Sequence, residues 1–228
     1  MLKNITNLGD AALYCDFGDK VNIETNSVVI KYFNQIRSLR IDGILNLTPS
    51  YNKLIISFDL NLTSSEKLIK IIKNVNTNEK LNIDKKIIEI PICLKDEFSL
   101  DLDRLVANLK LNKSAIFKTF LSKNYFCYMT GFIAGMPFLG DISNDLRFRR
   151  LDTPRVKVPK GSVGVTEQFC NIYSFESPGG WNIIGRTPFK IFDRDNENKP
   201  SLINPGDYVK FYEIDSNEYS KLNDWYFF

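Results

Sequence analysis

One candidate for chemistry is the stretch at residues 131–140, which reads Gly-Phe-Ile-Ala-Gly-Met-Pro-Phe-Leu-Gly and places three glycines within ten positions. Glycine permits positive φ and allows a ligand to approach the backbone closely. The aromatic side chains between the glycines could form the walls of a pocket. The stretch is neither a Walker A loop nor a dinucleotide fingerprint, because no Gly-Lys-Ser/Thr follows and the glycine spacing is wrong. The stretch could be either a binding loop or a tight corner of a barrel.

A second candidate is a basic run between positions 147 and 160. It contains Arg147, Arg149, Arg150, Arg155, Lys157 and Lys160, with Asp145 and Asp152 nearby. Arginine binds phosphate and carboxylate groups through paired hydrogen bonds, so this run could hold an anion. A solvated charged face is the alternative. The whole chain has 30 basic and 27 acidic residues, which is too balanced to predict binding to nucleic acid.

A third candidate is the stretch at residues 177–188, Ser-Pro-Gly-Gly-Trp-Asn-Ile-Ile-Gly-Arg-Thr-Pro. The proline and the two glycines, Gly179 and Gly180, predict a tight turn whose backbone N–H groups are free to face an anion. Trp181 offers a stacking surface, and Arg186 offers a fixed charge. A structural turn beside a packed tryptophan would leave the same pattern.

The composition excludes several kinds of chemistry. Histidine is absent, which removes the commonest general base and every histidine-ligated metal site. The four cysteines are far apart and form no C-x-x-C pair, so neither a zinc site nor a redox motif is predicted. Proton transfer would fall to groups such as Glu167, Glu176, Asp193 and Asp207, but their spacing selects no pair. No apolar run approaches the ~20 residues of a membrane helix, and we expect a cytoplasmic protein.

Hydrophobic periodicity in the first part of the chain predicts alternating strands and helices. We expect strands at 12–17, 44–48, 54–58 and 86–91, a helix capped by Asn26 that runs to about Arg40, and a second helix after the capping-box sequence at 63–66. This β-α-β-β-α-β order predicts a ferredoxin-like α+β domain. A polar stretch around 75–86 is the expected boundary, so we predict domains at 1–85 and 86–228.

The second part of the chain predicts a different architecture. Two short amphipathic helices are expected near 102–109 and 116–121. Short apolar segments between turns follow, at 126–129, 156–158, 161–165, 183–184, 189–192 and 208–212. Many short strands with regular turn signals predict an all-β sandwich or barrel.

The motifs taken together are more specific than each one alone. In order, they lie at residues 131–140, 153–163, 172–173, 177–188, 192–193 and 205–211, with further matches at 9–13 and 49–51. This series resembles the family of the 5-oxoprolinase B subunit, also called the KipI or allophanate hydrolase subunit 1 family, which is the carboxyltransferase domain with subdomains C and D. The resemblance covers nearly the whole chain.

The resemblance implies a fold and partners that spacing alone does not. It implies an N-terminal ferredoxin-like domain and a C-terminal cyclophilin-like β-barrel. It also implies a hydrolase component that is inactive alone and acts with two other 5-oxoprolinase components, the C subunit, which is a related barrel, and the A subunit. Together the three would use ATP, with Mg²⁺ at the level of the complex, to open 5-oxoproline to glutamate. No metal ligands are expected in this chain.

The resemblance also suggests site residues. Arg155 and Arg186 are the expected catalytic residues, which would hold phosphate or the substrate carboxylate. The expected substrate- or nucleotide-binding residues are Gly135, Phe138, Ser162, Gln168, Tyr173, Ser177, Gly179, Gly180 and Trp181. Gln168 is displaced by one position from the family pattern.

Two alternative functions stay open. Related modules in urea carboxylase transfer a carboxyl group from biotin, so the chain could be a carboxyltransferase-type module of urea and allophanate metabolism. A sporulation-kinase inhibitor also belongs to the family, so the chain could instead be a KipI-like inhibitor of a histidine kinase. We expect a small-molecule substrate in the enzyme cases, and neither nucleic acid nor membrane as a partner.

Overall fold

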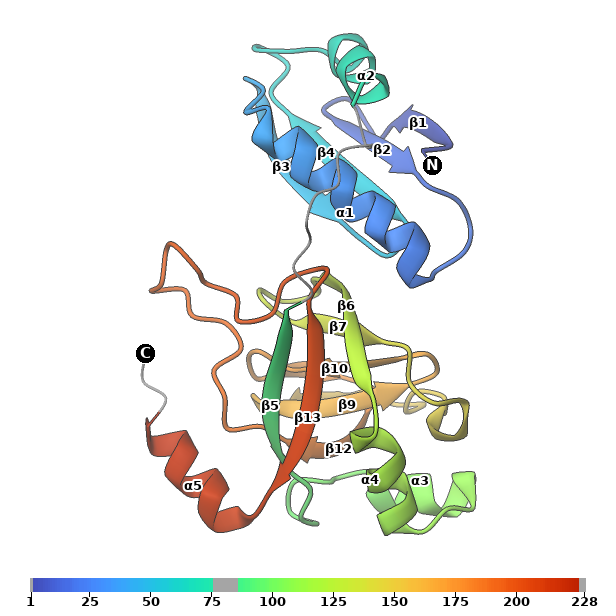
Figure 1. The fold of residues 1–228 in the computed structure, drawn as a ribbon, viewed down its shortest axis with the longest axis vertical. Coiled ribbons are helices and arrows are strands. Elements are labelled where there is room, and N and C mark those ends of the chain that lie inside the picture. The colour runs from blue at the N-terminus through green and yellow to red at the C-terminus, as the bar shows by residue number, and fades with distance from the viewer. Residues whose placement is uncertain (1, 76–85, 226–228) are drawn as a thin grey trace. The chain divides into compact units, whose positions relative to one another are not determined.

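The structure is a computed structural model that describes residues 2–75 and 86–225. The chain divides into two compact units, Met1–Asp84 and Lys85–Phe228 (Figure 1). The predicted domain boundary after residue 85 adjoins the stretch 76–85, which lies outside the described residues.

The first unit is an antiparallel sheet with two helices. Its elements are β1 (Asn4–Asn7), β2 (Ala12–Asp16), α1 (Ile23–Ser38), β3 (Ile44–Pro49), β4 (Lys53–Phe58) and α2 (Ser65–Lys73). The strand order is β1-β2-β4-β3, and each neighbouring pair is antiparallel. Alternate residues of β2 and β4, such as Leu13 and Ile56, are fully buried against apolar residues of both helices.

The prediction of a ferredoxin-like N-terminal domain is wrong. That prediction needs the strand at 86–91 to complete the N-terminal sheet. The structure instead places this strand, β5 (Ile87–Cys93), in the barrel of the second unit. The edge position beside β2 is taken by β1, a short strand whose mostly exposed, polar residues give no alternating signal. Hydrophobic alternation identified β5 as a strand but could not identify its neighbours.

The helix caps also differ from the prediction. Asn22, and not Asn26, caps α1, because its side chain accepts a hydrogen bond from the backbone N–H of Thr25 at 2.8 Å. Asn26 lies inside the helix and is buried. Its side-chain amide donates to the carbonyls of Ser50 and Tyr51, so it fixes the β3–β4 turn to the helix. Ser64 caps α2 within the predicted capping sequence.

The second unit is built on a closed barrel with the strand order β10-β7-β6-β13-β5-β12-β9, so the predicted barrel is present. The bounds of its strands are β6 (Asn124–Thr130), β7 (Pro137–Gly140), β9 (Ser162–Thr166), β10 (Phe169–Ile172), β12 (Asn182–Arg186) and β13 (Tyr208–Ile214). Beside the barrel, β8 (Arg155–Val158) and β11 (Ser177–Gly179) form a two-stranded sheet. The remaining elements are the helices α3 (Leu102–Leu109), α4 (Lys113–Leu121) and α5 (Ser216–Trp225) and the 3₁₀ turn η1 (Asn144–Leu146).

The barrel is closed by a long-range parallel pairing. β5 and β13 lie side by side in Figure 1 and pair from Ile87 with Tyr208 to Cys93 with Ile214. The last four residues of β5 are all buried, as expected for a strand that is covered on both faces. The helices at 102–109 and 116–121 are confirmed as α3 and α4. The predicted strand at 189–192 is absent, and Phe192 makes only an isolated bridge to Ser201.

Within the described parts of the chain, no helix is both long and apolar enough to cross a bilayer.

Candidate functional site

Five of the nine predicted binding residues line a hollow of about 440 Å³ in the second unit. Its walls come from four segments: the loop before β7 with the start of that strand, the loop before β8, the residue that follows β10, and the β11 turn. The lining residues are Phe132, Met136, Phe138, Arg150, Pro154, Tyr173, Pro178, Gly179, Gly180 and Trp181. Five of them were predicted from the sequence: Phe138, Tyr173, Gly179, Gly180 and Trp181.

Tyr173 and Gly179 lie close together in this hollow. An ideal Cβ on Gly179 would lie 2.1 Å from the Tyr173 hydroxyl oxygen, so only glycine lets the turn pass this close to the ring. Burial raises the pKa of Tyr173. The Asn171 amide, the Trp181 backbone N–H and the charges of Arg150 and Arg155 oppose that shift. The tyrosine is therefore a neutral hydroxyl held in a field that favours negative charge.

Arg150 supplies the only charged side chain among the lining residues. Its guanidinium carbon lies 5.6 Å from the centre of the Trp181 ring, and Trp181 in turn meets Phe138 edge-on at 5.6 Å. Within the described residues, no carboxylate lies within ion-pair distance of the Arg150 side chain, which is exposed. A guanidinium held over an aromatic wall and free of a carboxylate is suited to bind an anion.

Arg155 is placed differently from its predicted role. Its two terminal nitrogens donate to the two carboxylate oxygens of Asp101, at 2.9 and 2.6 Å. Asp101 is only 5% exposed and also accepts the backbone N–H of Ile183 at 2.7 Å. This forked pair ties β8 to the start of α3 and to β12. Arg155 does not line the hollow, although its charge reaches Tyr173.

Arg186 is also outside the hollow. Its Nε donates to the Lys160 carbonyl at 2.7 Å, and its backbone pairs with Ser162 between β12 and β9. Ser162 is buried in this pairing. The structure therefore does not bring the two predicted catalytic arginines to the surface of the hollow, where Arg150 is the lining cation.

Three further predicted residues, Gly135, Ser177 and Gln168, are not among the lining residues. Gly135 has φ +69°, and a Cβ there would collide with Phe192 at 2.4 Å, so it shapes the loop that carries Met136. Ser177 is buried at the start of β11, and its hydroxyl has no hydrogen-bond partner among the described residues. Gln168 donates its side-chain amide to Asp141, which also accepts a hydrogen bond from Tyr128, and it does not line the hollow.

Sequence reasoning undervalued Arg150, Pro154 and Met136. Arg150 was one of several basic residues in a run, and nothing in that run distinguishes it from its neighbours. The signal that could have selected it is its proximity to the Pro-Gly-Gly-Trp turn, and only the fold brings these two distant segments close. Among the described residues, no cluster of cysteine, aspartate and glutamate side chains could hold a metal ion.

The hollow suits a small, partly apolar anion. Phe138 and Trp181 offer flat apolar surfaces, Arg150 offers a fixed positive charge, and the Tyr173 hydroxyl and the glycine turn offer polar groups close by. Such a site can orient a ring-shaped carboxylate and exclude water from one of its faces.

Comparison with known proteins identifies the family. The family model described as carboxyltransferase domain, subdomain C and D, matches residues 3–203. The chain belongs to this family. All four segments that form the hollow fall inside the matched range, so the hollow is part of the shared domain.

Three members or relatives of this carboxyltransferase-domain family illustrate its range. The B subunit of 5-oxoprolinase from Bacillus subtilis is 31% identical over 94% of this chain and 94% of its own length. A urea amidolyase of Saccharomyces cerevisiae is 21% identical over 95% of this chain, which spans 13% of that enzyme. The crystal structure of TTHA0988 matches with a TM-score of 0.81 and 29% identity over 90% of this chain, which spans 40% of TTHA0988.

Proposed function

We propose that this chain is the B subunit of an ATP-dependent 5-oxoprolinase, which acts with the C and A subunits of that enzyme to open 5-oxoproline to glutamate. The likeness to the Bacillus subtilis protein of that name supports the proposal, because it extends over nearly the full length of both chains. The observation that carries it is the hollow, in which one free arginine faces two aromatic walls.

The chemical fit is to 5-oxoproline. This molecule is a five-membered lactam with one carboxylate, and a hollow of about 440 Å³ accommodates it. Arg150 would bind the carboxylate, and the wall formed by Phe138 and Trp181 would cover one face of the ring. The neutral Tyr173 hydroxyl would donate to the lactam oxygen and so orient the ring before that oxygen is phosphorylated.

The lactam needs activation, because amide resonance makes its carbon a poor electrophile. Transfer of a phosphoryl group from ATP to the lactam oxygen would turn that oxygen into a leaving group. Water would then add to the ring carbon, and cleavage of the C–N bond, with a proton passing to the nitrogen, would open the ring to γ-glutamyl phosphate. A second water would hydrolyse this acyl phosphate to glutamate and phosphate. The lining residues do not fit ATP itself. A single arginine would have to bind the triphosphate, and none of the described lining residues is a carboxylate that could bind Mg²⁺. We therefore assign this chain the lactam, and no step on ATP.

A partner is expected at the mouth of the hollow. Phe132 is 68% exposed and Val156 is 80% exposed, and both belong to segments that build the hollow or its flanking sheet. Exposed apolar side chains around a functional hollow favour a protein contact. We propose that the C subunit covers this rim, that the chain is inactive alone, and that the complex works in the cytoplasm, where ATP is available.

Reconstitution tests this function. The chain is purified with the C and A subunits encoded by its own genome, and glutamate release from 5-oxoproline is measured with and without ATP. We expect release only with all three proteins and ATP, and roughly 10–100-fold lower kcat/KM for Arg150→Gln, as for loss of a charge-assisted hydrogen bond.

Arg147→Gln is the matched control for this assay, because Arg147 is an exposed arginine of the same run that does not line the hollow. It should keep full activity. No glutamate release from the intact complex would refute the proposed function. Biotin-dependent carboxyl transfer by the same complex would favour the carboxyltransferase alternative.

A further inference from the structure

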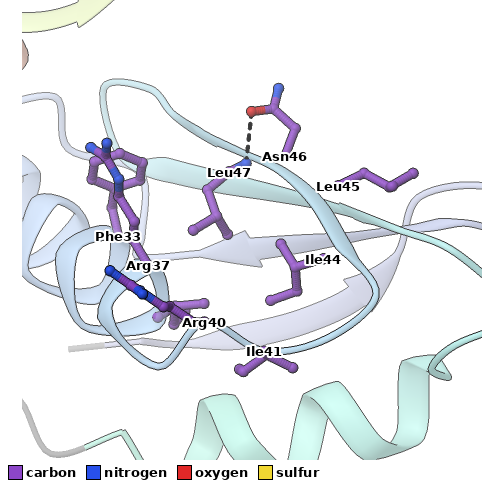
Figure 2. A pocket seen from close by; sticks show the side chains of 9 residues that line it. Phe33, Arg37, Arg40, Ile41, Ile44, Leu45, Asn46 and Leu47 are labelled. Atoms are coloured by element: carbon purple, nitrogen blue, oxygen red, sulfur yellow. Dashed lines mark hydrogen bonds between the residues drawn. The ribbon is translucent and has the colours of Figure 1, made fainter. Parts of the chain in front are cut away.

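A second recess lies in the first unit, whereas the hollow belongs to the second. It is a groove of about 370 Å³ between the C-terminal half of α1 and the strand β3. Figure 2 shows Phe33, Arg37 and Arg40 on the helix side and Ile44 and Leu47 on the strand side. Ile36, Ile41, Leu45 and Asn46 complete the lining. We call this recess the β3 groove.

The strand side of the β3 groove is a sheet edge. β3 is the last strand in the order β1-β2-β4-β3, and its pairing with β4 shifts between Ile44 and Asn46. The backbone N–H of Leu47 donates to the side-chain oxygen of Asn46 at 2.9 Å, as the dashed line in Figure 2 shows. This local bond occupies a donor that a strand neighbour would otherwise take, and Asn46 is exposed.

Apolar surface continues along the same strand. Leu45 is 69% exposed, although it belongs to a strand of the sheet. Together with Ile44 and Leu47 it offers an extended segment both a backbone to pair with and apolar side chains to pack against. Peptides that add a strand to a sheet edge use this combination of contacts.

The helix side gives the β3 groove its charge. Arg37 lies over the Phe33 ring, with 5.9 Å between the guanidinium carbon and the ring centre, and Arg40 follows the end of α1. Both side chains are exposed, and no ion pair of either one occurs within residues 2–75 and 86–225. None of the described residues that line the groove is acidic. Its electrostatic complement is therefore a carboxylate.

The backbone of Arg40 adds an independent observation. Its φ is +46°, in the left-handed region just after a helix, where glycine is the residue that folding favours. Glycine at this position would therefore strain the backbone less. Arg40 instead adopts a backbone conformation that disfavours a side chain, beside an apolar groove and a free sheet edge.

From these contacts we propose that the β3 groove docks an extended acidic segment of a partner protein. The segment adds to the free edge of β3. Alternate side chains of the segment point toward α1, where apolar ones fill the groove and carboxylates bind Arg37 and Arg40. On docking, Asn46 gives up the Leu47 N–H to a carbonyl of the segment. This interaction is separate from the hollow and does not depend on the proposed function.

A peptide titration of the full chain tests the proposal. The probe is a fluorescent peptide of about ten residues, with Thr at odd positions and Val, Glu, Leu, Glu and Val at even ones. The control peptide carries Lys in place of each Glu. We expect saturable binding of the Glu peptide that weakens with added salt, and at least roughly tenfold weaker binding of the Lys peptide.

Three variants separate binding from folding. Arg40→Gly should bind the Glu peptide roughly tenfold more weakly while its melting temperature does not fall, because glycine suits the backbone there. Lys73→Ala removes one positive charge from the exposed face of α2 in the same unit and should bind as wild type does. Asn46→Ala should bind a few-fold more tightly, since the Leu47 N–H no longer has to be released.

Hydrogen exchange shows whether a strand is added. The Leu47 amide should exchange more slowly in the complex with the Glu peptide. Equal affinity for the two peptides, no binding at about 1 mM, or no protection of Leu47 would overturn the proposal. Self-association of the free chain that Arg40→Gly abolishes would also overturn it, because a second copy would then be the occupant.

Discussion

Arg150 and Arg155 are five positions apart in one basic run, yet the fold gives them opposite environments. Arg155 is held by both oxygens of Asp101, and this carboxylate is buried and also accepts the Ile183 N–H. Arg150 lies over Trp181 and lines the hollow, with no carboxylate partner among the described residues. The same side chain is therefore a structural tie in one place and an available charge in the other.

The difference shows which observation assigns a role to an arginine. Both residues could bind an anion, but the guanidinium of Arg155 already has its charge paired and its two-nitrogen fork occupied by a buried carboxylate. The charge that remains open to a substrate is the one over the aromatic wall. The tie in turn holds β8 close to β12, and so supports the turn that carries Gly179.

The largest effect is expected from Asp101→Ala. It leaves Arg155 without its partner in a mostly buried setting and removes the acceptor of the Ile183 N–H, so we expect a loss of about 3 kcal/mol in the free energy of unfolding. Denaturant titration measures it. Asp152→Ala is the control, since the pair of Asp152 with Arg149 is exposed on both sides and should contribute less than about 0.5 kcal/mol. Similar losses for both variants would contradict the assigned tie.

Arg150→Gln should show the reverse pattern. We expect the roughly 10–100-fold loss in kcat/KM of the assembled enzyme given above, with the unfolding midpoint little changed, because the side chain is exposed and its contact with the fold is the exposed cation–π contact with Trp181. Steady-state kinetics and thermal denaturation on the same preparation measure both quantities. A stability loss as large as that of Asp101→Ala would make Arg150 a second structural tie.

Gly179→Ala tests whether the turn shapes the hollow. Its Cβ would meet the Tyr173 hydroxyl at 2.1 Å, so the ring or the turn must move into the space for the ligand, and we expect activity to fall roughly tenfold. Gly180→Ala is the matched control. Its Cβ would find its nearest neighbour, a Pro154 carbon, at 3.5 Å, and activity should change less than about twofold. Equal effects would mean that the contact with Tyr173 is not the reason for glycine.

The smallest effect is expected from Arg155→Lys. Lysine keeps the charge but cannot donate to both oxygens of Asp101 in a fork, so we expect a loss of about 1 kcal/mol in unfolding free energy and little change in KM. Denaturant titration and steady-state kinetics measure the two. A raised KM with unchanged stability would return Arg155 to a role in substrate binding.

The sequence predicted most elements but not all of their partners. Alternating apolar residues located β2, β4 and β13, and helical spacing located α3 and α4. The assignment of β5 to the N-terminal sheet was wrong, because the strand pairs with β13 more than a hundred residues later and no local pattern encodes that choice. The strand β1 was missed because its exposed polar residues carry no period.

The candidate site was also predictable only in part. Glycine and tryptophan motifs identified the turn at 177–181 and the aromatic wall at Phe138, because their backbone demands are local. The choice among arginines was not predictable. It depends on Asp101, which is 54 positions from Arg155, and on Trp181, which is 31 positions from Arg150. Only the folded chain shows which guanidinium is already paired.

The most direct measurement is a crystal structure of the assembled complex with 5-oxoproline. We predict that the carboxylate lies about 3 Å from the Arg150 guanidinium and that one face of the ring packs on the wall formed by Phe138 and Trp181, with the Arg155–Asp101 pair intact. The account would be contradicted by 5-oxoproline bound elsewhere, or by its carboxylate on Arg155 or Arg186 with no contact to Arg150.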